Sequence, residues 1–171
     1  MQIVIGCLLI VGAIIFFLVK KLGASPTGIS DGTSVPPTLD DMILAAANRY
    51  GTEAALVKAI VKVESDFDSS AVNPSDPSYG LMQITPSVAA DYGLVKDPYN
   101  PSAGELTLLM DPQMNLNIGS WLLHRLLFQT GGDFDTAVQM YNEGPANYRA
   151  GKRVPDYLAK VKEAYDAYKL Q

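Results

Sequence analysis

The chain has 171 residues, enough for one domain of about 130 residues with attachments, and it carries a net charge of −5 at pH 7. This acidic balance, with no basic cluster longer than Lys152-Arg153, argues against a nucleic-acid interface. A single Cys excludes an internal disulfide, and without zinc-ligand spacing or a Gly-rich phosphate loop we expect neither a metal nor a cofactor.

An uncharged, mostly apolar segment occupies residues 3–19 and is closed by Lys20-Lys21. At 1.5 Å per residue it spans about 25 Å, and about 30 Å if the flanking lysines snorkel. A cleavable signal peptide carries its positive charge before the apolar run, whereas here the charge follows it. The pattern therefore predicts a single transmembrane anchor over residues 1–21 and favours it over a signal peptide.

Residues 22–37 are rich in Gly, Ser, Thr and Pro and have no hydrophobic periodicity. This composition predicts a flexible linker between the anchor and a domain over residues 38–171. No internal repeat is visible, so a solenoid is not expected.

The domain begins with a capping pair, because Thr38 is followed three residues later by Asp41, and Gly51 ends this first helix. Thr52 is predicted to cap the second helix. A loop rich in Ser, Asn, Asp and Pro covers residues 66–79 and has room for at most a short β-hairpin before Gly80. Further helices are predicted over residues 86–92, 105–110 and 112–130, from Asp133 onward, and along 157–168, with a loop over 142–153. The fold class is therefore mainly α.

Glu64 is the residue that departs from its surroundings. The second helix has apolar residues at i, i+1, i+4 and i+5, namely Leu56, Val57, Ile60 and Val61. Glu64 falls on this apolar face, whereas Lys58 and Lys62 point the other way. Burial and the negative end of the helix dipole both raise the pKa of such a carboxyl group, which suits it to act as a general acid. The alternative is a helix-end Glu turned out to solvent.

Four motifs occur in order along the domain. They are Glu64-Ser65 at a helix end, Gly80-Leu81-Met82-Gln83-Ile84 before Thr85-Pro86, Tyr141-Asn142-Glu143-Gly144-Pro145, and YLAKVKEAY from Tyr157 to Tyr165. Together they resemble the signature of the SLT-type lytic transglycosylases, in the goose-type lysozyme-like superfamily. The resemblance implies a lysozyme-like α-helical domain.

The resemblance also implies an activity, cleavage of the β-1,4 bond between N-acetylmuramic acid and N-acetylglucosamine in peptidoglycan. In that mechanism Glu64 first protonates the departing oxygen. As a carboxylate it then takes the proton of the muramic C6 hydroxyl, which closes onto C1 to give a 1,6-anhydro product. One carboxyl group suffices because the nucleophile belongs to the substrate.

Five further residues receive substrate-binding roles from the resemblance. Gln83 is expected to line the groove and bond sugar, Tyr141 to orient Glu64, and Asn142 to contact substrate, with Ser78 and Asn73 as loop contacts near the family's loop Ser. Ordinary roles are the alternatives: a surface amide for Gln83, a core aromatic for Tyr141 and a helix C-cap for Asn142. The chain departs from the family pattern at Glu143, where Ala is usual, and at Thr85, where Met is common.

The expected partners are peptidoglycan strands, and the membrane through residues 3–19. We expect a single-pass protein whose domain faces the cell wall, from a bacterial inner membrane or a phage virion membrane, although lysines after the anchor favour the opposite orientation. One alternative is a goose-type muramidase, a hydrolase, in which Asp76 holds the water. The other is a non-catalytic protein that docks on glycan or builds a virion.

Overall fold

The computed structural model describes residues 36–170. The predicted anchor over residues 1–21, its apolar core 3–19 and all but the end of the predicted linker over 22–37 lie outside the described residues. Within the described part, no helix combines the length and the apolar character needed to cross a bilayer.

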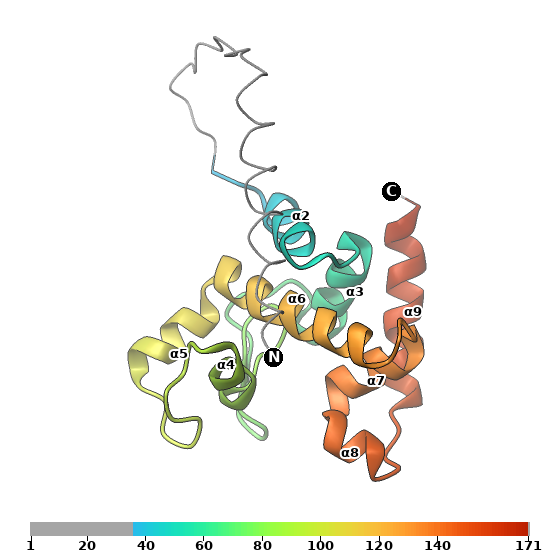
Figure 1. Cartoon of the computed structure of the whole chain (residues 1–171). Helices are drawn as coiled ribbons and strands as arrows, with labels where there is room; N and C mark the ends of the chain where they lie inside the picture. The colour runs from blue at the N-terminus through green and yellow to red at the C-terminus, as the bar shows by residue number, and fades with distance from the viewer. Residues whose placement is uncertain (1–35, 171) are drawn as a thin grey trace, which may run out of the picture. The chain divides into compact units, whose positions relative to one another are not determined.

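The described residues form a mainly α fold, as predicted (Figure 1). The elements in chain order are α2 Leu39–Tyr50, α3 Ala54–Ser65, β1 Val72–Asn73, β2 Ser78–Tyr79, α4 Pro86–Tyr92, α5 Ala103–Met110, α6 Pro112–Gln129, α7 Phe134–Glu143, α8 Pro145–Arg149 and α9 Pro155–Lys169. The two short strands pair antiparallel, Val72 with Tyr79 and Asn73 with Ser78, which confirms the predicted hairpin before Gly80.

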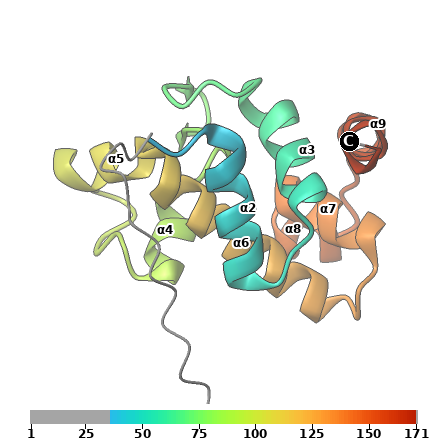
Figure 2. The ribbon, with the colours of Figure 1, turned by 90° about the horizontal axis from the view of Figure 1, so that it is seen from above.

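Helix α6 lies at the centre of the fold and is buried continuously over residues 115–120. It packs against α2, α4, α5 and α7, and α3 lies between α2 and α9 (Figure 2). The core between these helices is formed by large aliphatic side chains, among them Ile43, Ile60, Leu81, Met82, Leu116, Ile118 and Leu123. Burial of these side chains is the main term that holds the helices together.

The helix ends follow the predicted caps with one exception. Thr38 and Asp41 form a capping box, and Gly51 ends α2 at φ 67°. The prediction that Thr52 caps α3 is wrong, because the N-cap of α3 is Glu53 and no side chain bonds there. The turn at Gly51 brings the Thr52 backbone N–H to the Ala47 carbonyl at 2.9 Å, so Thr52 completes the end of α2 instead.

Two other boundaries differ from the prediction. Helix α5 begins at Ala103, before the expected Glu105, because Ser102 and Glu105 form a capping box. The predicted loop over 142–153 contains the short helix α8, which starts at Pro145, where proline is accepted in a first turn. Five residues are too few to show helical periodicity in a sequence.

Replacing Gly119 with Ala is expected to destabilise the fold. A Cβ added there lies 2.2 Å from the sulfur of the buried Met82, so the Met82 side chain or the backbone that carries it must shift. Overpacking of this kind costs about 1 to 3 kcal/mol of unfolding free energy. Chemical denaturation measures the loss, and Gly104→Ala is the matched control, because a Cβ at that helical position meets nothing within 4 Å. Equal stability of the two variants would contradict the packing described here.

Candidate active site

Glu64 lies at the last turn of α3, on the side whose apolar residues are buried. Its side chain is half-buried, so the alternative of a fully solvent-turned carboxylate is not what the structure shows. The helix ends directly after it, because Asp66 and Phe67 both adopt left-handed backbone conformations, at φ 52° and 67°. Left-handed residues other than Gly cost about 1 to 2 kcal/mol each, and such strain is concentrated at functional sites.

The segment from Tyr79 to Ile84 forms a tight turn beside the end of α3. The two end residues exchange both backbone hydrogen bonds, at 3.1 and 3.0 Å. The Ser65 hydroxyl donates to the Leu81 carbonyl at 2.9 Å, which ties the turn to the residue next to Glu64. We call residues 79–84 the floor turn.

Asn115 of α6 holds the floor turn from below. Its side-chain oxygen accepts the Met82 backbone N–H at 2.7 Å, and its amide nitrogen donates to the Tyr79 and Leu109 carbonyls, both at 2.7 Å. The residue is fully buried. Gly80, at φ 72°, lies so close that an added Cβ would be 2.6 Å from the Asn115 amide nitrogen, so this position admits only Gly.

Two tyrosines complete the surroundings of Glu64. The Tyr157 hydroxyl, from α9, donates to Glu64 Oε1 at 2.6 Å. The Tyr141 hydroxyl, from α7, donates to the Met82 carbonyl at 2.9 Å. The hydrogen bond to Glu64 thus comes from Tyr157, and the expected orienting role of Tyr141 stays a prediction. Tyr141 supports the floor turn, and its inward-facing hydroxyl has the partner that the sequence pattern required.

Burial raises the pKa of Glu64 to about 7, and the hydrogen bond from Tyr157 opposes this rise because it stabilises the carboxylate. At neutral pH the protonated acid and the carboxylate are therefore both populated. A group in this state can give a proton to a leaving group and later accept one, which is the requirement for a general acid and base.

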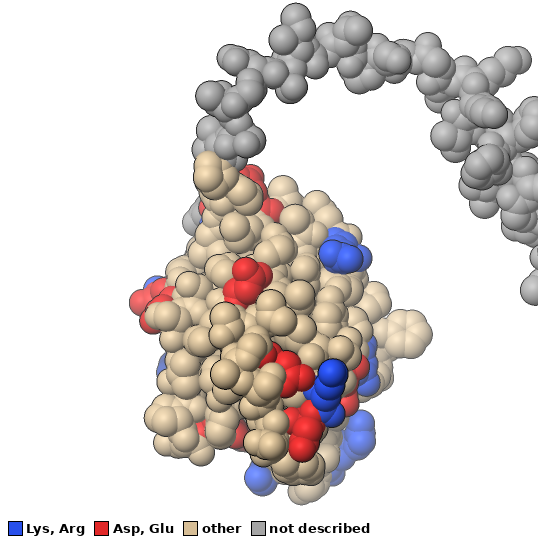
Figure 3. All heavy atoms as spheres, turned by 90° about the vertical axis from the view of Figure 1, so that its left-hand side faces the viewer, with Lys and Arg blue, Asp and Glu red and all other residues tan. Residues whose placement is uncertain are grey.

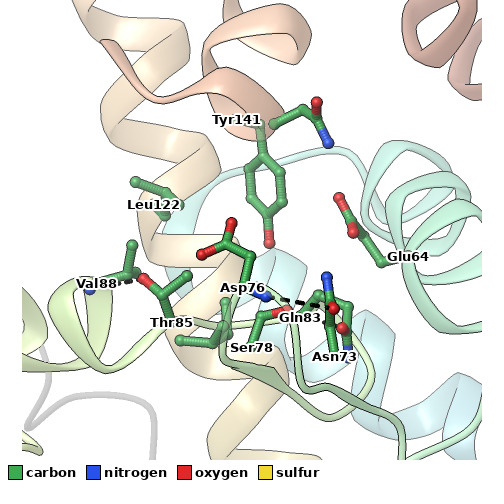
Figure 4. A pocket seen from close by; sticks show the side chains of 11 residues that line it. Glu64, Asn73, Asp76, Ser78, Gln83, Thr85, Val88, Leu122 and Tyr141 are labelled. Atoms are coloured by element: carbon green, nitrogen blue, oxygen red, sulfur yellow. Dashed lines mark hydrogen bonds between the residues drawn. The ribbon is translucent and has the colours of Figure 1, made fainter. Parts of the chain in front are cut away.

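A pocket of about 230 Å³ opens beside Glu64 (Figure 4). The catalytic and binding candidates from the sequence all line it, namely Glu64, Asn73, Ser78, Gln83, Tyr141 and Asn142, together with Asp76, Ile84, Thr85, Val88 and Leu122. Residues 78 positions apart in the chain thus meet at one cavity, from Glu64 to Asn142. Their roles toward a substrate stay predictions.

Gln83 is already engaged by the protein. Its backbone is left-handed at φ 47°, and its amide nitrogen donates to the Ala71 and Gly80 carbonyls at 3.2 and 2.9 Å. Its side-chain oxygen accepts from the Ser78 hydroxyl at 2.9 Å. These bonds join the hairpin to the floor turn, so Gln83 shapes the wall of the pocket.

Asn73 and Asp76 belong to the hairpin turn. The Asn73 side-chain oxygen accepts the backbone N–H groups of Ser75 and Asp76 at 3.1 and 3.4 Å, which fixes the turn. The Asp76 carboxylate reaches into the pocket from the side opposite Glu64 (Figure 4). The pocket therefore holds two carboxyl groups. In the described part of the chain, no group of His, Cys, Asp and Glu is arranged to hold a metal ion.

A model of the family described as "Transglycosylase SLT domain" matches residues 41–162. The chain belongs to this family. The match covers the pocket with all its lining residues and runs from the first helix of the fold into α9.

Curated relatives of this SLT domain include proteins named membrane-bound lytic murein transglycosylase. The E protein of Buchnera aphidicola is 40% identical over 83 residues, which cover 47% of this chain and 36% of that protein. The C protein of Edwardsiella ictaluri is 35% identical over 81 residues, 47% of this chain and 22% of that protein. The chain thus spans about a third or less of the length of these relatives.

Solved structures support the SLT-domain fold. The 70 kDa soluble lytic transglycosylase of Escherichia coli superposes with a TM-score of 0.58 at 24% identity, over 75% of this chain and 23% of that one. The complex of a 70 kDa soluble lytic transglycosylase with bulgecin A gives 0.61 at 24% identity, over 78% and 24%. At this identity the likeness concerns the fold, which is the expected lysozyme-like one.

Sequence reasoning gave no role to three residues that build this SLT site, namely Asn115, which it missed, and Ser65 and Tyr157, which it named only as parts of motifs. Asn115 stands in an otherwise apolar buried helix, where a polar side chain needs partners, so its position was a usable signal. The position of Tyr157 was also a usable signal, because the hydroxyl group of a tyrosine on the inward face of a helix needs a hydrogen-bond partner. Thr85 has a simple structural role, since its hydroxyl accepts the Val88 N–H and caps α4.

Replacing Tyr157 with Phe is expected to raise the pKa of Glu64 further. The lost hydrogen bond stabilised the carboxylate, whereas burial, which favours the protonated acid, remains. Titration of the Glu64 carboxyl carbon by NMR measures the shift without requiring activity. Tyr141→Phe is the matched control, because its hydroxyl donates to Met82 and should leave the Glu64 titration almost unchanged. An unchanged or lowered pKa in the Tyr157 variant would contradict the assigned contact.

Proposed function

We propose that this protein is a peptidoglycan lytic transglycosylase that cleaves the bond between N-acetylmuramic acid and N-acetylglucosamine. The observation that carries the proposal is Glu64, a half-buried acid with a pKa of about 7 that lines the pocket and is held by Tyr157. Membership of the SLT domain family and the names of the curated relatives support the same activity.

In the proposed reaction, the protonated Glu64 donates its proton to the glycosidic oxygen as the bond to C1 breaks. The resulting carboxylate takes the proton of the muramic C6 hydroxyl, whose oxygen forms the new bond to C1. Glu64 returns to its protonated state and the product carries a 1,6-anhydro ring. The pKa of about 7 suits both steps, because neither protonation state is strongly disfavoured at neutral pH.

The proposal extends to the place of action. The relatives are named as membrane-bound, and residues 3–19 of this chain are apolar enough for an anchor. We propose a single-pass membrane protein whose domain reaches the glycan strands of the cell wall through residues 22–37. The face that carries α4 and α5 shows acidic and basic side chains scattered among uncharged atoms, without a continuous basic patch (Figure 3). A nucleic-acid partner is accordingly not proposed.

Product analysis tests the reaction. Purified sacculi are digested with the protein and the soluble fragments are examined by mass spectrometry. Anhydro ends are expected. Because no water is added, they are lighter than reducing ends by the mass of one water molecule, about 18 Da. Reducing ends alone would show that water is the nucleophile.

A hydrolytic muramidase is the second candidate, and Asp76 is the observation that favours it. Its carboxylate faces the same pocket from the side opposite Glu64, where it could activate a water molecule (Figure 4). Asp76→Asn separates the two mechanisms. A hydrolase loses most of its activity with this change, whereas a transglycosylase continues to form anhydro ends.

A further inference from the structure

A second hollow of about 840 Å³ borders the pocket and shares Asp76 and Thr85 with it. Three separate segments form its walls: the hairpin and the start of α4, the loop before α5, and the junction of α7 and α8. The walls contain Pro77, Pro86, Ser87, Pro98, Tyr99, Glu143, Gly144, Pro145, Ala146 and Asn147. We call it the side hollow.

The charge in the side hollow has one sign. Asp76 and Glu143 contribute carboxylates, and none of the lining residues is Lys, Arg or His. Within residues 36–170, neither carboxylate forms an ion pair. Asp76 lines both cavities, whereas Glu143 lines the side hollow and directly follows Asn142, a residue of the pocket wall. A ligand that fits this charge carries a positive group.

The rest of the lining suits a cation on a hydrocarbon stem. Four proline rings and Ala146 offer apolar surface, and Tyr99 is 96% exposed, so its ring is free to contact a ligand. The face of a tyrosine ring attracts an ammonium group, and the stem of a basic side chain packs on apolar surface.

We infer that the side hollow binds the basic side-chain amine of the peptide that is attached to the muramic acid in the pocket. This inference rests on the proposed cleavage of peptidoglycan. N-acetylated sugars are neutral, so a continuing glycan strand gives the two carboxylates no charged partner. The stem peptide begins on the muramic unit itself, and its diamino acid supplies a free amine in strands that are not cross-linked. Glu143 is then a specificity-determining residue that favours uncross-linked strands.

The experiment compares kcat/KM on native sacculi, which keep free stem amines, with kcat/KM on sacculi whose amines have been acetylated. The wild type is expected to prefer the native substrate by about threefold to tenfold, the range for one partly exposed charge pair and a second carboxylate nearby. Glu143→Gln should lower this ratio, because only Asp76 then remains, and Glu143→Lys should bring it to one or below. Glu163→Gln, on the exposed side of α9, should keep the wild-type ratio.

Glycan strands freed of their peptides by an amidase serve as the internal reference. Wild type and Glu143→Gln should cleave them equally, which also shows that the variant is folded. A native-to-acetylated ratio that is as high in Glu143→Gln as in the wild type overturns the inference, as does a ratio of one in the wild type.

The same strands distinguish the source of the amine. N-deacetylation gives the sugars of peptide-free strands free amines. If the wild type then cleaves the deacetylated strands better than the N-acetylated ones, the amine is that of the sugar and the assignment to the peptide is wrong. Equal cleavage of native and acetylated sacculi leaves the proposed function intact, whereas cleavage of none of the substrates overturns the proposed function as well.

Discussion

Replacing Glu64 with Gln is expected to lower the rate of glycan cleavage by at least about 10² to 10⁴-fold, the usual contribution of a general acid. The amide has nearly the same shape, and it can still accept the Tyr157 hydrogen bond, but it has no proton to donate to a glycosidic oxygen. Release of soluble fragments from sacculi measures the loss. A protein that only docks on glycan would bind sacculi equally well with either residue and release nothing in either form.

The same change is expected to increase stability at alkaline pH. The pKa of Glu64 is about 7 in the folded state, against an ordinary value of 4.5. The folded state therefore binds the proton more tightly, and the wild type loses stability as pH rises from about 4.5 to 7. A shift of this size corresponds to about 3 kcal/mol. Gln has no charge to bury, so the stability of the variant does not fall over this pH range.

Denaturation at two pH values tests this expectation. The unfolding free energy of Glu64→Gln relative to wild type should be about 3 kcal/mol more favourable at pH 8 than at pH 4. Glu163→Gln is the control, because it makes the same chemical change at an exposed position of α9 that forms no ion pair within residues 36–170, and it should show no such difference. A pH-independent difference for Glu64→Gln would mean that the carboxyl group is not sheltered from water in the folded protein.

Replacing Asn115 with Asp is expected to have the second large effect. It should lower the free energy of unfolding by about 3 to 5 kcal/mol at pH 8. The side chain keeps the acceptor for the Met82 N–H, but it loses both donors and places a carboxylate against the Tyr79 and Leu109 carbonyls. Such a buried group binds its proton more tightly when folded, so the cost should grow as pH rises and shrink toward pH 5.

Urea denaturation at pH 5 and pH 8 measures this cost. Asn100→Asp, in an exposed loop, makes the same chemical change and should stay within about 0.5 kcal/mol of wild type. Because the floor turn carries Gln83 and the Met82 carbonyl, cleavage should weaken together with stability in Asn115→Asp. Wild-type stability of this variant at pH 8 would show that Asn115 does not hold the floor turn.

The parts of the fold that could be predicted from the sequence depend on local chemistry. The Thr38–Asp41 capping box and the Gly51 stop each involve residues at most four positions apart. Such signals can be recognised in the sequence without knowledge of the tertiary structure. The prediction that Thr52 caps α3 is wrong for the same reason. A local pattern cannot distinguish a residue that caps the next helix from one that completes the end of the preceding helix, as Thr52 does.

The site was predictable where one residue contradicted its surroundings. Glu64 was recognised as a carboxylate on an apolar face, and its raised pKa follows from that placement. The residue that bonds it was not recognised, because Tyr157 lies 93 positions away and only packing of α9 on α3 brings the two together. The resemblance gives the orienting role to Tyr141, whereas the hydrogen bond to Glu64 comes from Tyr157.

The distance along the chain between Glu64 and Tyr157 has a consequence for synthesis. Helices α2 to α8 precede α9 in the chain, so a nascent chain that has not yet reached α9 leaves Glu64 without its hydrogen-bond partner Tyr157. The carboxyl group at the end of α3 therefore acquires its tyrosine partner only after nearly all of the chain has been synthesised.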